Sequence, residues 1–195
     1  MRPVAAELIE LEAGPYVFPV YGAASLRRSG AGADLFGELG QPVLACADGR
    51  LFSVGWTRRG GNRLWLRDGA GNTFSYAHLS AFSTLAAAGR HVHAGQVIGF
   101  LGRTGRVDSS RSRVHFEIHP VSLLYLGRKG AVEPLKYFRR WKRVETLPLA
   151  IAAGWSPDVP GATKAPEPGA TLLAVDDISS ADGLDPGSLA RVLRR

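Results

Sequence analysis

Five histidines are the side chains in this sequence best suited to bind a metal or to move a proton. They are His78, His91, His93, His115 and His119. Imidazole titrates near neutral pH and is the commonest metal ligand in proteins. The most specific local patterns surround two of them, because His78 ends the run Tyr76-Ala77-His78 and His115 lies within Val114–Ile118. Both runs are typical of β-strands, so we expect both imidazoles to lie on a sheet.

The other three histidines leave alternatives open. In His91-Val92-His93 the two imidazoles stand two residues apart, and on a strand they would point to the same side and could clamp a metal. His119 follows His115 by four residues and shares its face if the strand continues to Pro120. It could serve there as a ligand, a partner or a capping residue.

Short apolar or alternating runs, separated by Gly-containing turns, predict that the surrounding elements are strands. The runs are Tyr16–Val20, Pro42–Ala47, Arg50–Trp56, Arg63–Arg67, Thr73–His78, Val97–Leu101 and Val114–Ile118. Asp48-Gly49 separates the second run from the third and predicts a hairpin. No clear helical period intervenes, so we expect a mainly β protein with an antiparallel sheet or sandwich core over residues 16–120.

The segments outside this core have a different composition. Residues 1–15 form an N-terminal lead, and residues 121–154 a helical extension packed on the core. Glu133-Pro134 is typical of a helix start, and an apolar stripe of Leu135, Phe138 and Trp141 follows it. Basic residues surround this apolar stripe, so the alternative function of the helix is to form a surface that binds an anionic partner.

The C-terminal segment, residues 155–195, has the Pro and Gly content of a linker and tail. We expect residues 156–175 to be extended and mobile, and Pro186–Arg195 to form a short helix.

The net charge limits the classes of partner. The chain carries +7, divided into +9 over residues 1–154 and −2 over residues 155–195. A basic body attracts nucleic acid, anionic lipid surfaces or an acidic cell wall. Because Cys46 is the single cysteine, an internal disulfide is excluded, and no apolar run is long enough for a membrane span.

A series of short motifs adds a specific family signal. Gly32-x-Asp34, Pro42-Val43 and Asp48-Gly49 come first, followed by Tyr76-x-His78, the glycine-rich run 95–105 and His115. In order and spacing the series resembles the M23 (lysostaphin- and LytM-like) zinc metallopeptidases, β-sheet enzymes that cut peptide cross-bridges of bacterial peptidoglycan. The resemblance runs from about Tyr16 to about Pro120 and implies the LytM-like fold.

The resemblance also implies a site. The family binds zinc through the His and Asp of an HxGxD motif and the second His of an HxH motif. A Tyr-x-His histidine and the first HxH histidine assist the chemistry. Here Asp34 and His115 match zinc ligands and His78 matches a catalytic histidine, but Gly30 and Arg113 replace the other two histidines. The same comparison places His91 and His93 on a turn away from the site.

These replacements weaken the expected metal site. A catalytic zinc takes three protein ligands, and Asp34 and His115 supply two. Arg113 stays protonated, so it repels the cation and cannot act as a base. We therefore expect zinc to be absent or weakly bound, and Arg113 either to pair with Asp34 or to turn to solvent.

The sequence is compatible with three functions. The first is a non-catalytic domain that binds peptidoglycan or regulates a cell-wall hydrolase. The first alternative is an active zinc endopeptidase that cleaves peptidoglycan cross-links, and the second is a basic nucleic-acid-binding protein. The resemblance implies a cell-envelope or extracellular location, but Met1–Gly14 lacks a signal-peptide pattern, which favours the cytoplasm if the start is genuine.

Overall fold

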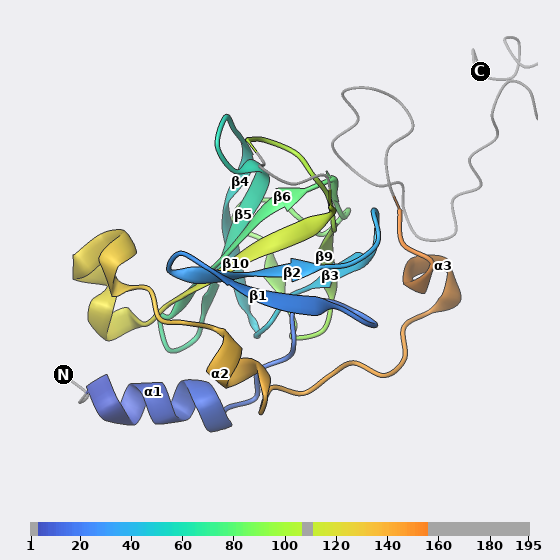
Figure 1. Cartoon of the computed structure of the whole chain (residues 1–195). Coiled ribbons are helices and arrows are strands. Elements are labelled where there is room, and N and C mark those ends of the chain that lie inside the picture. The colour runs from blue at the N-terminus through green and yellow to red at the C-terminus, as the bar shows by residue number, and fades with distance from the viewer. Residues whose placement is uncertain (1–3, 107–110, 156–195) are drawn as a thin grey trace, which may run out of the picture.

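The structure is a computed structural model that describes residues 4–106 and 111–155. These residues form two antiparallel sheets with short helices around them (Figure 1). The seven-stranded sheet has the order β1 (Ser25–Ser29), β2 (Gly32–Phe36), β10 (Arg113–His119), β6 (Thr73–Leu79), β5 (Gly61–Asp68), β4 (Gly49–Thr57) and β8 (His91–Val92). The three-stranded sheet has the order β3 (Pro42–Leu44), β9 (Val97–Phe100) and β7 (Ala81–Phe82). The prediction of a mainly antiparallel β fold is confirmed.

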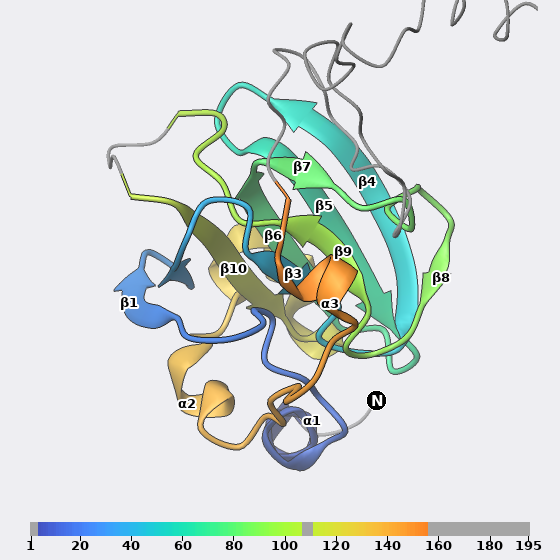
Figure 2. The same cartoon turned by 90° about the vertical axis from the view of Figure 1, so that its right-hand side faces the viewer.

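Alternating side chains form the core between the sheets. On β5, Leu64 and Leu66 are fully buried, whereas the intervening Trp65 is half-buried. Successive side chains of a strand point to opposite faces, so such strands bury one face and leave the other for the surface. Figure 2 looks onto the three-stranded sheet, with the large sheet curving around it.

The predicted hairpin across Asp48-Gly49 is wrong. β3 pairs with β9, whereas β4 pairs with β5 and β8, so the residues between Leu44 and Gly49 carry the chain from one sheet to the other. A side chain at Gly49 would collide with the carbonyl oxygen of Arg67 on β5. Gly49 therefore permits the close approach of two strands and does not form the expected turn.

The N- and C-terminal segments of the described chain differ from expectation. The N-terminal lead contains helix α1 (Val4–Ala13), and the helix after Pro134 is the single turn α2 (Leu135–Phe138). Tyr16–Val20 forms only isolated bridges, at Val17 and Val20. Trp141, beyond the end of α2, makes a tertiary contact with the N-terminal helix, since its indole Nε1 donates to the Leu11 carbonyl at 2.8 Å.

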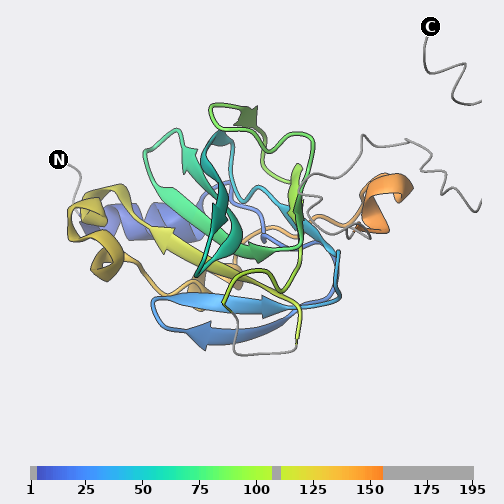
Figure 3. The same ribbon diagram turned by 90° about the horizontal axis from the view of Figure 1, so that it is seen from above.

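Two further helical segments complete the described chain. The 3₁₀ segment η1 (Val121–Gly130) lies near α1 at one end of the molecule, and α3 (Leu149–Ala152) lies at the opposite end (Figure 3). No helix in the described ranges has the length and apolar character needed to cross a bilayer. The predictions for residues 156–175 and Pro186–Arg195 lie outside the described residues.

Tyr76 generates a stability prediction. Its side chain is fully buried and its hydroxyl accepts a hydrogen bond of 2.9 Å from the Cys46 backbone N–H. Tyr76→Phe leaves that buried N–H without its acceptor, so we expect a loss of about 1–3 kcal/mol in the free energy of unfolding. Urea denaturation measures it. Tyr125→Phe, at a 77% exposed position, is the matched control, and equal effects of the two variants would contradict the assignment.

Candidate functional site

Strand β10 presents one apolar and one polar face. Val114, Phe116 and Ile118 are fully buried in the core. The alternate residues Arg113, His115, Glu117 and His119 therefore share the opposite face. His115 pairs in register with Asp34 on β2 and with Ala77 on β6, so the sheet brings the two predicted ligand positions side by side.

Asp34 is the centre of the first contacts on this face. Its side chain is 3% exposed, and its Oδ1 lies 2.7 Å from His115 Nδ1. Its Oδ2 lies 3.6 Å from Arg113 Nε and 3.4 Å from Arg27 Nη2. Burial alone would raise the pKa of Asp34, but the hydrogen bond from His115 and the charges of His115 and Arg113 hold it below its usual range. The predicted pairing of Arg113 with Asp34 is present, as a single ion-pair contact.

Glu117 is a site residue that the motif comparison missed. Its Oε1 lies 3.3 Å from His115 Nε2 and 3.2 Å from Arg128 Nη2, and its Oε2 lies 2.9 Å from His119 Nε2. The sequence signal that could have identified Glu117 as a site residue is its position two residues after His115, which places both side chains on the same face of the strand. Burial would lower the pKa of His115, but its hydrogen bonds to Asp34 and Glu117 raise that pKa to about 9. At neutral pH His115 is thus an imidazolium held between two carboxylates.

His78 lies on the same side of the sheet, with its ring centroid 6.4 Å from that of His115. Its backbone has a φ of 67°, which is uncommon for a residue other than glycine. Its Nδ1 lies 2.9 Å from the Thr104 carbonyl oxygen, so Nδ1 carries the proton. Burial lowers the pKa of His78 and keeps the ring neutral.

The loop at 102–105 holds His78 in this position. Thr104 Oγ1 accepts from the Asn62 backbone N–H and donates to the Leu79 carbonyl. Side chains at Gly61 or Gly105 would collide with the backbone of this contact. Gly61 and Gly105 therefore allow the two backbone segments next to His78 to pack closely against each other.

A groove of about 440 Å³ collects these side chains. Asp34, His78 and His115 all line it, as the sequence predicted, together with Arg113 and Glu117. His91 and His93 do not line it. His93 lies instead 3.7 Å from the Asp48 carboxylate.

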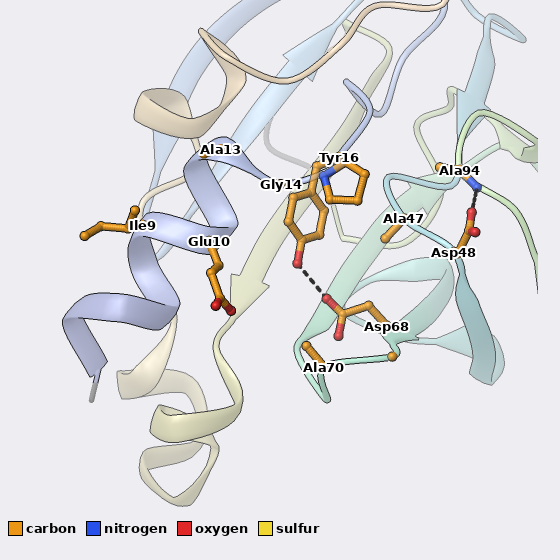
Figure 4. A pocket seen from close by; sticks show the side chains of 12 residues that line it. Ile9, Glu10, Ala13, Gly14, Tyr16, Ala47, Asp48, Asp68, Ala70 and Ala94 are labelled. Atoms are coloured by element: carbon orange, nitrogen blue, oxygen red, sulfur yellow. Dashed lines mark hydrogen bonds between the residues drawn. The ribbon is translucent and has the colours of Figure 1, made fainter. Parts of the chain in front are cut away.

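A second cavity, of about 610 Å³, lies beside the C-terminal end of α1 (Figure 4). The Tyr16 hydroxyl donates to Asp68 at 2.8 Å, and Asp48 accepts from the Ala94 backbone N–H at 2.7 Å. The cavity contains no histidine and its lining is mainly apolar. It lacks the chemical groups that make the groove a candidate site.

Asp34 and His115, the two metal ligands expected from the sequence, both line the groove. Within residues 4–106 and 111–155, no group of three or more His, Cys, Asp or Glu side chains is placed to hold a metal ion. At Gly30, an added Cβ would meet nothing within 4 Å, so this position has free space but no side chain.

Comparison with known proteins gives one family. The model of peptidase family M23 matches residues 28–132. The L-Ala–D-Glu endopeptidase of Bacillus subtilis (strain 168) is 32% identical over 126 residues, which are 61% of this chain and 37% of that protein. The murein hydrolase activator NlpD of Escherichia coli (strain K12) is 36% identical over 107 residues, 54% of this chain and 25% of NlpD. The chain thus matches well under half the length of either relative.

The solved structures agree on the fold. Lysostaphin from Staphylococcus simulans superposes with a TM-score of 0.52 at 27% sequence identity, covering 64% of this chain and 53% of lysostaphin. This likeness confirms the LytM-like fold that the sequence predicted.

The His115 imidazolium generates a prediction on pH. Because its pKa is about 9 in the folded chain, against an ordinary 6.5, its stabilising contribution is fully present below about pH 6.5 and is lost as the pH rises through about 9. NMR titration of the His115 ring should give this pKa. Glu117→Gln should lower it, whereas Glu145→Gln, at an exposed position, should not. A His115 pKa at or below 6.5 in the unmodified chain would refute the paired imidazolium.

Proposed function

Because the chain belongs to peptidase family M23, we propose that it is a non-catalytic member whose groove binds peptidoglycan or a cell-wall hydrolase. The contact between His115, Asp34 and Arg113 carries this proposal. His115 Nδ1 bonds Asp34 directly at 2.7 Å, and the Arg113 guanidinium faces the same carboxylate. Positive groups of the chain itself thus neutralise the carboxylate that a metal would neutralise in the family.

The residues present do not fit a catalytic zinc. Such a zinc takes three protein ligands and keeps one position for water, whereas Asp34 and His115 provide two and Gly30 provides none. The side chain of Arg113 is 9% exposed, so its charge is poorly screened. Two unit charges about 4 Å apart interact with roughly 4 kcal/mol at an effective dielectric of about 20, and a divalent ion doubles the repulsion.

Two relatives support the wall as the place of action. One is by name a peptidase of an L-Ala–D-Glu bond and the other an activator of murein hydrolases. A basic domain also suits a wall that carries anionic polymers. We therefore place the protein in the cell envelope and expect peptidoglycan or a hydrolase as its partner.

Co-sedimentation with purified peptidoglycan sacculi tests this function. We expect the full chain to sediment with the sacculi and to release no soluble fragments, with or without added zinc. Release of fragments that depends on zinc would establish the active peptidase instead. If the chain alone does not sediment, the assay is repeated with an added cell-wall hydrolase, because a hydrolase is the other proposed partner. No binding in either arm would overturn the proposal.

Restoring the two missing histidines generates a prediction on metal binding. We expect Gly30→His combined with Arg113→His to bind about one zinc per chain, because the pair adds a third ligand and removes the repelling charge. Each single change should fail to do so. Elemental analysis after dialysis measures the zinc. The imidazole introduced by Gly30→His would stand on a backbone with a φ of 58°, at a cost of roughly 1–2 kcal/mol.

Gly69→His with Arg139→His is the matched control, because it adds two histidines at exposed positions outside the groove. Stoichiometric zinc in the unmodified chain, at micromolar affinity or tighter, would show that the present residues suffice to bind the metal and would favour the active zinc peptidase over the non-catalytic domain.

A further inference from the structure

Arg113 has donors that the folded chain does not use. Its Nε and Nη1 are buried without a hydrogen-bond partner among the described residues. Asp34 does not supply one, because 3.6 Å between Nε and Oδ2 exceeds hydrogen-bonding distance. The Asp34 oxygens are already engaged by His115 and Arg27. Buried donors normally find an acceptor, so the groove is suited to a ligand that brings one.

The charges around the groove select an anion. Of the described residues that line it, five are arginines and two, Asp34 and Glu117, carry carboxylates. Glu117 is engaged by His115, His119 and Arg128. Arg59, Arg63 and Arg106 also line the groove, and none of them forms an ion pair with a carboxylate in the described part of the chain. Among the residues that the structure describes, the groove therefore carries an excess of positive charge.

His78 narrows the class of anion. Its Nδ1 proton goes to the Thr104 carbonyl, so its Nε2 is an acceptor, and this atom has no partner within the described ranges. A peptide brings an amide N–H for such an acceptor, whereas the ionised phosphodiester of a nucleic-acid backbone brings no donor. A groove of about 440 Å³ has the size of a small-ligand site, not of a channel that follows a nucleic-acid strand.

We propose that the groove binds a short peptide through a carboxylate, with Arg113 donating to that carboxylate and His78 Nε2 accepting an N–H of the same peptide. A guanidinium presents parallel N–H groups that match a carboxylate. This inference rests on the proposed function, in which the Arg113 guanidinium takes the place of a metal ion beside Asp34. It adds the chemical class of the ligand that the groove binds.

Calorimetric titration of the full chain with two probes tests the inference. The probes are acetyl-Ala-Ala with a free carboxylate and the same dipeptide as its C-terminal amide. We expect the acid to bind at least about tenfold more tightly, because hydrogen bonds between charged groups are stronger than neutral ones. Arg113→Gln should abolish this difference, whereas Arg139→Gln, at an exposed position outside the groove, should retain it.

NMR of the unmodified chain keeps the test decisive if Arg113→Gln does not fold. The acid should shift the Arg113 Nε–H signal, and the amide should not. Equal affinity for acid and amide, or tighter binding of inorganic phosphate than of the acid, would overturn the inference. If the chain sediments with sacculi without digesting them but shows no preference for the dipeptide acid, only the peptide-carboxylate inference is overturned. Zinc-dependent digestion of the sacculi would instead overturn the proposed function.

Discussion

The buried carboxylate of Asp34 is the constraint on which the groove depends. An ionised carboxylate with 3% of its side chain exposed is stable only if positive charge faces it. His115 meets this need with a direct hydrogen bond and Arg113 with an ion pair. Since His115 also bonds Glu117, one imidazolium links both acidic residues of the groove. In the proposed function, the His115 imidazolium and the Arg113 guanidinium neutralise the Asp34 carboxylate, which a metal ion neutralises in the zinc peptidases of the family.

Strand β10 couples this charge network to the core. Phe116 and Ile118 are fully buried on one face, while His115 and Glu117 project from the other. A shift of one residue in strand register would exchange the two faces. Apolar packing therefore fixes where the charged groups stand, and the register between His115 and Asp34 follows from the same packing.

The sequence predicted most of the strands because their apolar residues alternate, as around Leu64 and Phe116. It predicted β3 and β9 from continuous apolar runs, but it did not predict β1 (Ser-Leu-Arg-Arg-Ser) or β2 (Gly-Ala-Asp-Leu-Phe), because neither contains a long enough apolar or alternating run. Motif order nevertheless placed Asp34, His78 and His115 in one groove. The role of Glu117 and the left-handed backbone of His78 depend on contacts with other strands and with Thr104, which local patterns do not contain.

Diffraction at the zinc absorption edge, from crystals grown with excess zinc, shows directly whether a metal binds between Asp34 and His115. We expect no anomalous peak between Asp34 and His115, a direct hydrogen bond between these two side chains, and the Arg113 guanidinium facing the carboxylate. A zinc peak bonded to both Asp34 and His115, with Arg113 turned out of the groove, would contradict it.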